Sequence, residues 1–177
     1  MRRSWHRADR SPVRVSDRSE GVSLKTRPTS TARWESTITI DRPIEDVFDR
    51  LTDLGSYGVW MPRTGLFGSC RQTSVGPVDR GTKYIDSTRM GRFHGEVTDF
   101  ERPSRVTFSE VMRVFGREAV RSRAGYDLAS NGTGTVVHHV ADTEMFGVMR
   151  LMKPFVPWMS KSERSRVLAS LKRSLEE

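Results

Sequence analysis

Between Gly65 and His139, apolar and polar residues alternate in short runs that are separated by turn-forming residues. Alternation with a period of two is typical of β-strands whose apolar side chains cover one face of a sheet. Short connections between the runs favour hairpins, and therefore an antiparallel meander. The pattern predicts a first strand from about Ala32 to Ile40 and further strands near residues 66–74, 82–90, 93–100, 105–115, 117–129 and 134–143.

Helical spacing appears after the first strand. Ile44, Val47, Phe48 and Leu51 predict a helix that follows Asp41-Arg42-Pro43, with Asp41 or Arg42 as its cap. A short second helical turn is predicted at Tyr57, Val59 and Trp60, and Pro62 ends it.

The C-terminal stretch from about Gly147 to Glu177 also predicts a helix. Pro154 and Pro157 are expected to kink or break it, because proline removes a backbone donor and clashes with the preceding turn. Ser160-Lys161-Ser162-Glu163 has capping-box spacing, so a restart at Ser160 is one alternative.

This order of elements predicts an α+β fold. A curved antiparallel sheet of about seven strands, with a long C-terminal helix across its concave face, is the simplest way to cover the apolar side of the strands. Residues 1–32 are rich in Arg, Ser and Asp and show no hydrophobic period. We therefore expect a disordered basic tail over 1–32 and one folded domain over 33–177.

The net charge of +8 first suggests a nucleic-acid partner. Residues 1–33 carry +6 of this charge, however, and the remaining +2 is spread over the predicted domain. Binding of phosphates in a groove needs a concentrated basic stripe, so we expect no nucleic-acid partner. The tail is a candidate for contact with anionic surfaces, for organelle targeting or for binding another protein, or it is an over-long start.

Cysteine and hydropathy patterns narrow the class further. Cys70 is the one cysteine, and no cysteine–histidine cluster has zinc spacing, so we expect neither a disulfide, a metal site nor a cofactor. The sequence has no run of eighteen apolar residues and no apolar stretch after Arg2-Arg3. These features favour a soluble protein of the cytoplasm.

Several segments resemble the START-like (SRPBCC) superfamily, which includes polyketide cyclases, dehydrases and lipid-transfer proteins. The segments that carry the resemblance are Ile38–Phe48 with Leu51-Thr52-Asp53 and Tyr57-Gly58-Val59-Trp60, Val97–Val106, Tyr126-Asp127-Leu128 with Asn131–Val137, and the terminal amphipathic helix. The resemblance spans roughly residues 33–177 and implies a helix-grip fold, with a cavity between the sheet and the last helix. It implies no particular ligand, because the superfamily contains binders, transporters and enzymes.

Two functions follow from this resemblance. The first is a carrier or sensor that binds a small hydrophobic molecule, such as a lipid or a polyketide, in the cavity. The second is an enzyme of the polyketide cyclase, aromatase or dehydratase type that moves protons with a buried acid or base. Pockets for small molecules are mostly apolar. The candidate lining residues are Trp60, Tyr84, Phe108, Met112, Tyr126, Met149, Met152 and Phe155.

Three titratable residues are weak candidates for catalysis. Glu110 shares a predicted strand face with Phe108 and Met112, so a one-residue register shift would move it outward. His138 and His139 are adjacent in a strand and must point to opposite faces, so they do not act as a pair. Either histidine is a candidate for the interior position, where a neutral imidazole can act as a base or orient a ligand.

The stretch from Met145 to Met159 is apolar but contains Arg150 and Lys153. An apolar lip with basic residues suits transient contact with an anionic membrane surface. The alternative is a buried helix side with its charges in solvent.

Overall fold

The computed structural model describes residues 32–62, 67–152, 154 and 156–177, without the side chains of Met152 and residues 156–163. The predicted tail lies outside the described residues except for Ala32, where the first strand begins. Phe155 and the side chain of Met152, both predicted to line the cavity, also lie outside them.

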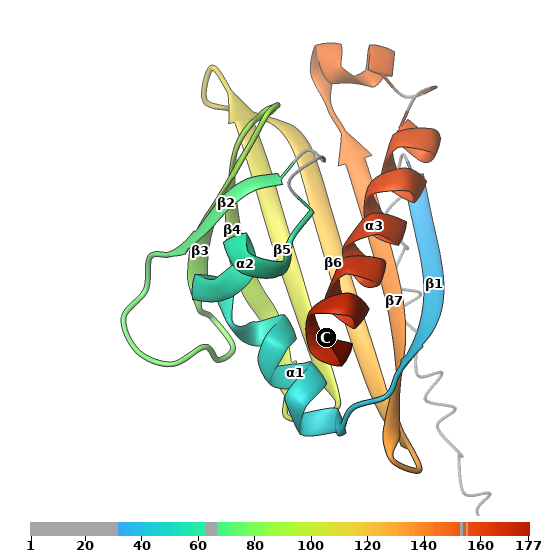
Figure 1. Cartoon of the computed structure of the whole chain (residues 1–177). Helices are drawn as coiled ribbons and strands as arrows, with labels where there is room; N and C mark the ends of the chain where they lie inside the picture. Colours follow the sequence, from blue (N-terminus) through green and yellow to red (C-terminus); the bar gives the residue numbers. More distant parts are fainter. Residues whose placement is uncertain (1–31, 63–66, 153, 155) are drawn as a thin grey trace, which may run out of the picture.

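Seven strands form one antiparallel sheet in the order β1-β7-β6-β5-β4-β3-β2. The first strand therefore pairs with the last, and the remaining strands follow as a meander (Figure 1). This confirms the predicted α+β architecture. The strands are β1 (Ala32–Ile40), β2 (Phe67–Gln72), β3 (Lys83–Thr88), β4 (Gly91–Glu101), β5 (Arg105–Val114), β6 (Arg117–Asn131) and β7 (Gly134–Met145).

The helices lie on one side of this sheet. The longest, α3 (Val156–Glu176), runs across the concave side over β6, β7 and β1, and the other two α-helices lie beside it (Figure 1). The shorter elements are α1 (Ile44–Thr52), α2 (Tyr57–Trp60) and the 3-10 helices η1 (Leu54–Ser56) and η2 (Gly147–Met152). The arrangement confirms the predicted helix-grip fold.

The start of α1 differs from the prediction. Helical geometry begins at Ile44, so Pro43 occupies the cap position and neither Asp41 nor Arg42 caps the helix. Both residues bind the far end of α3 instead. The backbone N–H of Asp41 donates to Glu176 Oε1 at 2.8 Å, and the Arg42 guanidinium donates to the carbonyl of Leu175. A guanidinium at the end of a helix satisfies a carbonyl that has no partner within the helix.

The C-terminal helix also differs in detail. The break near Pro154 is confirmed, because η2 ends at Met152 and α3 begins at Val156. The predicted restart at Ser160 is wrong, since α3 runs unbroken from Val156 to Glu176. Pro157 falls in the first turn, where its missing N–H costs no hydrogen bond.

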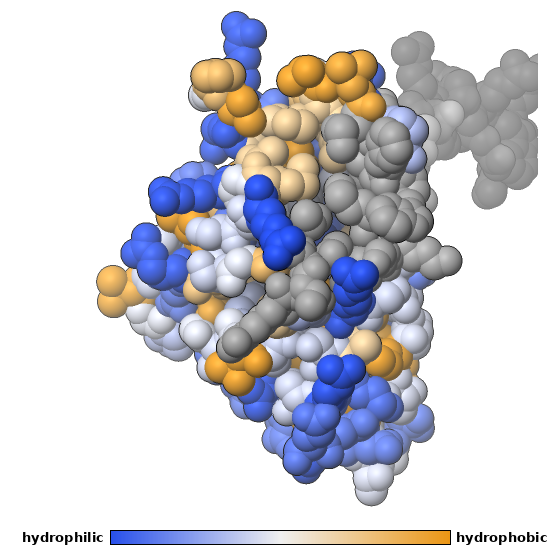
Figure 2. Space-filling model, turned by 45° about the horizontal axis from the view of Figure 1, so that its top comes forward, coloured by the Kyte–Doolittle hydropathy of each residue, from blue (hydrophilic) through white to orange (hydrophobic). Residues whose placement is uncertain are grey.

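One end of the molecule brings together the β3–β4 turn, the β5–β6 turn and η2, as antiparallel strand order requires. Exposed apolar side chains gather there. Phe115 at the β5–β6 turn is fully exposed, and Val148 and Leu151 of η2 are 72% and 76% exposed. Figure 2 turns this end forward and shows hydrophobic groups next to hydrophilic ones.

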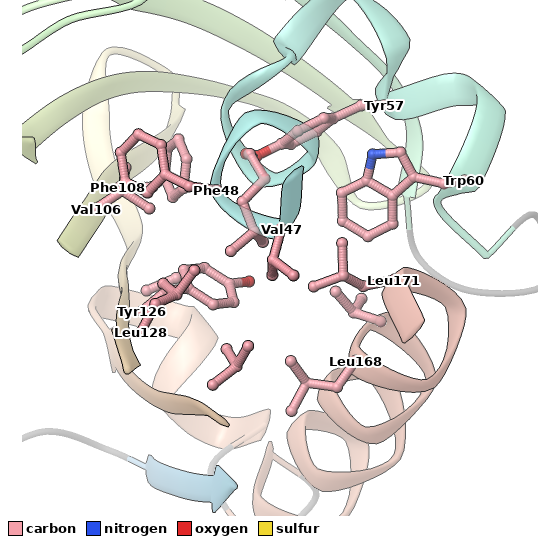
Figure 3. Close-up of a cluster of buried hydrophobic side chains, with 14 of the residues drawn as sticks. Val47, Phe48, Tyr57, Trp60, Val106, Phe108, Tyr126, Leu128, Leu168 and Leu171 are labelled. Atoms are coloured by element: carbon pink, nitrogen blue, oxygen red, sulfur yellow. The ribbon is translucent and has the colours of Figure 1, made fainter. Parts of the chain in front are cut away.

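The main core lies between the concave face and the helices (Figure 3). Val47, Phe48 and Leu51 of α1 and Leu168 and Leu171 of α3 are buried against residues of β4–β7. A second, smaller cluster lies apart from it and is rich in methionine. Its members are Met112, Ala119, Val120 and Met145, with Ala32, Met90, Phe93 and Met149 packed against them. No helix in the described part of the chain is long and apolar enough to cross a membrane.

Candidate functional site

A polar row crosses the apolar concave face. The strand register places Tyr84 opposite Gly95, Gly95 opposite Glu110, and Glu110 opposite Ser122. Residues that face each other across neighbouring strands point to the same side of a sheet. Arg164 reaches this row from α3 and donates to Ser122 Oγ at 3.2 Å. The row thus combines a phenol, a carboxylate, a hydroxyl and a guanidinium within the core.

Gly95 allows Tyr84 and Glu110 to meet across the strand between them. A side-chain carbon at Gly95 would lie 2.2 Å from the Tyr84 ring, so only glycine leaves room for the ring to cross β4. The Tyr84 hydroxyl then donates to Glu110 Oε1 at 2.9 Å. Burial, followed by the charge of Glu110, raises the pKa of Tyr84, so the phenol remains a donor.

Asp86 lies one pleat further along β3 than Tyr84. The residue is only 3% exposed, and its Oδ1 atom has no hydrogen-bond partner among the described residues. Burial, and then the charge of Glu110, raises the pKa of Asp86 to about 7. Cys70 lies opposite Asp86 on β2 and is hydrogen-bonded to it. Burial and this carboxyl group raise the pKa of the Cys70 thiol, so the thiol is the donor.

His139 of β7 is fully buried, with an exposed fraction of 0%. Its Nδ1 atom lies 2.8 Å from the carbonyl oxygen of Gly125, so Nδ1 carries the proton and Nε2 is left as an acceptor. Nε2 has no partner among the described residues. Burial, followed by the charge of Arg164, lowers the pKa of His139 to about 3, which keeps the ring neutral. The ring stacks on Tyr126 at 4.2 Å.

The predicted catalytic candidates separate by face. His138 lies on the outer face, where its Nε2 is 2.9 Å from Glu35 Oε1, and His139 takes the interior position. Glu110 faces the interior with Tyr84, so the predicted register of β5 is confirmed.

The predicted lining residues fall into three groups. Trp60, Tyr84, Phe108 and Tyr126 belong to the main core, and Phe108 contacts both tyrosine rings edge to face. Met112 and Met149 belong to the methionine-rich cluster. Met152 and Phe155 lie outside the described side chains. Contact of any of these residues with a ligand stays a prediction.

The sequence reasoning missed Asp86 and Arg164 as polar groups of the interior. Asp86 follows Tyr84 by two positions in a strand, so period-two alternation places it on the same face. Arg164 precedes Val167, Leu168 and Leu171 by three, four and seven positions, which places it on the buried stripe of α3. Both positions are therefore interior by spacing alone, although their side chains are polar.

A small hollow lies beside Asp86. It has a volume of about 10 Å³ and is lined by Tyr57, Gly58, Met61, Phe67, Gly68, Ser69, Cys70 and Asp86. A larger depression of about 750 Å³ lies between α2 and α3 and includes Trp60, Arg166 and Arg173 in its lining. The large chamber predicted between the sheet and α3 stays a prediction, because the first eight side chains of α3 lie outside the described part. Among the described residues, no three His, Cys, Asp or Glu side chains form a group that could hold a metal ion.

Solved structures share this fold. A START superfamily protein of Mycobacterium smegmatis aligns with a TM-score of 0.65 at 12% identity, over 81% of this chain and 97% of that one. A hypothetical protein of Helicobacter pylori gives a TM-score of 0.69 at 11% identity, over 98% and 99%. A putative protein from the dynemicin biosynthetic locus gives 0.52 at 17% identity, over 81% of this chain and 47% of that one. These identities show a common fold only.

Comparison with curated proteins gives no match. The family described as polyketide cyclase / dehydrase and lipid transport matches residues 31–176, most of the chain. The match covers every described strand and helix, from β1 to the end of α3. The protein belongs to the polyketide cyclase / dehydrase and lipid transport family.

Proposed function

We propose that the protein binds a small, largely apolar molecule against the concave face of its sheet. One observation carries this proposal. Trp60 Nε1, Asp86 Oδ1 and His139 Nε2 are buried polar atoms without a partner among the described residues. Each unsatisfied buried polar atom costs about 1–3 kcal/mol, and native proteins contain few of them. A ligand or water that meets these atoms relieves that cost.

The surroundings of the three atoms fit an apolar ligand with a few polar groups. Tyr84, Phe108 and Tyr126 form a continuous aromatic wall, and Trp34 and Tyr126 both contact the ring of His139. Pockets for small molecules commonly combine such walls with a few polar groups that fix orientation. The family description, which includes lipid transport, agrees with this ligand class.

Filling the interior tests the proposal. Ala124 of β6 is buried on the concave face, opposite Phe108 and Ala141. Ala124→Leu should occupy the ligand's space and weaken binding of the neutral apolar dye Nile red by about tenfold or more. The matched control is Ala129→Leu, on the same strand but exposed and facing outward. Dye fluorescence titrations report affinity, and native mass spectrometry reports a retained ligand.

Two outcomes would contradict this proposal. One is that wild-type protein neither retains a ligand nor binds the dye. The other is that folded Ala124→Leu binds the dye as tightly as Ala129→Leu. Ala141→Val adds less volume at the neighbouring position and repeats the test if Ala124→Leu does not fold.

The carboxyl pair favours a second candidate function, proton transfer of the polyketide cyclase or dehydratase type. Asp86, whose pKa is about 7, takes up or releases a proton near neutral pH, and Glu110 is its neighbour. This function requires turnover of a polyketide that Asp86→Asn abolishes, while Glu96→Gln, at an exposed position of β4, preserves it. If the protein binds an apolar ligand but turns over no polyketide, the proposed carrier function stands and the proposed enzyme function falls.

A further inference from the structure

The hollow beside Asp86 has room for a single small group. Its volume of about 10 Å³ corresponds to roughly one water-sized probe. Asp86 is its deeply buried acid, and Tyr57, Met61 and Phe67 supply aromatic and thioether walls. The unpartnered Oδ1 atom of Asp86 gives this hollow a polar requirement that its other walls do not meet.

The occupant of the hollow must donate hydrogen bonds. Two donors near Asp86 are already engaged, since the Cys70 thiol is hydrogen-bonded to Asp86 itself and the Tyr84 hydroxyl to Glu110. The Tyr57 hydroxyl donates to the carbonyl of Leu51 at 2.7 Å. None of these three groups reaches Asp86 Oδ1, so a donor that enters the hollow finds an open acceptor there.

Charge around the hollow favours a cationic donor over a neutral one. Asp86 from β3 and Glu110 from β5 are the two acids, while Arg164 of α3 is the nearby cation. Arg164 is already hydrogen-bonded to Ser122 and Tyr126, on the β6 side of the row. Cys70 from β2 and Tyr57 from α2 face Asp86 as neutral groups. Aromatic walls add attraction for a cation that lies near a ring.

We infer that the hollow holds the protonated amine of an otherwise apolar ligand, with Asp86 as its main partner. This inference rests on the proposed function and specifies its ligand class. The ammonium group donates to Asp86 Oδ1 and compensates the charge of the carboxyl pair. A hydroxyl group can donate one hydrogen bond but compensates no charge, and a carboxylate is repelled.

Binding of an amine at this position is linked to a proton. Asp86 has a pKa of about 7, so part of the population is protonated at neutral pH. An ammonium group beside Asp86 favours the ionised form and releases that proton. Affinity for the amine therefore rises as the pH rises toward 7 and then levels off. An alkylamine stays protonated throughout this range, since a Lys-type amine has a pKa of about 10.4.

A ligand series with one alkyl chain tests the inference. Dodecylamine, dodecanol and dodecanoate, below their aggregation concentrations, are titrated into the full chain by calorimetry and by displacement of Nile red. The amine should bind about tenfold tighter than the alcohol, as expected for a charge-assisted hydrogen bond, and the acid should bind most weakly. Calorimetry of the amine at pH 6 in two buffers of different ionisation enthalpy should reveal proton release.

The variants localise the effect. Asp86→Asn keeps the shape of the side chain and should remove both the amine preference and the proton release. Glu96→Gln removes an exposed carboxylate of β4 and should retain both. Proton release is measured on wild-type protein, so it tests the amine inference even if Asp86→Asn does not fold.

The outcomes separate the two claims. Equal binding of amine and alcohol, tightest binding of the acid, or amine binding without proton release overturns the inference while apolar ligand binding stands. If none of the three ligands and no dye binds, the proposed function falls, and the inference falls with it.

Discussion

Two buried groups of the concave face link stability to pH in opposite senses. The pKa of Asp86 is about 7 in the folded protein, against 3.8 for an unperturbed aspartate as in the unfolded chain. The folded state therefore binds more protons between these values, and the protein loses stability as the pH rises from about 4 to 7. The pKa of His139 is about 3 against 6.5, so His139 costs stability as the pH falls from 6.5 to 3. Between pH 4 and 6.5 the two effects oppose each other.

Asp86→Asn isolates the first effect. The amide keeps the shape and the donor toward Glu110 but cannot ionise, so the variant should be more stable than wild type at pH 8 by roughly 1–3 kcal/mol. The difference should shrink toward pH 5, where Asp86 is already mostly protonated. Urea unfolding at pH 5, 6, 7 and 8 measures this difference in the free energy of unfolding. The contribution of His139 cancels in the difference, because both proteins contain it. Stability curves that run parallel across this range would show that Asp86 is not a buried titrating acid.

At the scale of elements, β4 must lack a side chain where Tyr84 crosses it. Gly95→Ala should destabilise the fold by about 1–3 kcal/mol, because the new carbon overlaps the buried ring. The matched control is Gly125→Ala on β6, whose added carbon would meet no atom closer than 3.6 Å and should be tolerated. Adding Tyr84→Ala should reduce the cost of Gly95→Ala, which a double-mutant cycle of unfolding free energies measures. An unchanged cost would show that the ring is not what excludes the alanine.

The elements and the faces of their residues were largely predictable from the sequence, whereas the pairings within the interior polar row were not. Period-two alternation fixed the faces of β5 and β6, and it placed Glu110 inward. The partner of Glu110 could not be predicted in this way, because Tyr84 comes from two strands away and meets it only across Gly95. Likewise, local capping rules named Asp41 and Arg42 for α1, but contacts with the distant end of α3 engage both residues. Pairings between distant segments depend on strand register and packing, which cannot be deduced from a single sequence.

At the scale of the whole molecule, we propose that the end formed by η2 and the β3–β4 and β5–β6 turns touches an anionic membrane surface. Leu151 and Val148 project there with Phe115, and Arg150 and Arg117 are exposed near them. Such a mixture of apolar and basic side chains suits shallow insertion among anionic headgroups. The methionine-rich cluster lies directly beneath, since Met149 of η2 and Met90 of the β3–β4 turn pack against it.

Leu151→Asp tests this end in the full chain. The substitution removes an apolar side chain worth about 1.5–3 kcal/mol on burial and adds a negative charge, so binding to vesicles that contain an anionic phospholipid should weaken about tenfold or more. Val75→Asp replaces an exposed apolar side chain in the β2–β3 loop at the opposite end, so it is the matched control and should bind as wild type does. Vesicle co-sedimentation measures both, and the basic N-terminal segment contributes equally because both variants contain it. If Leu151→Asp and Val75→Asp sediment alike, attraction to the vesicles comes from general charge, and η2 has no part in it.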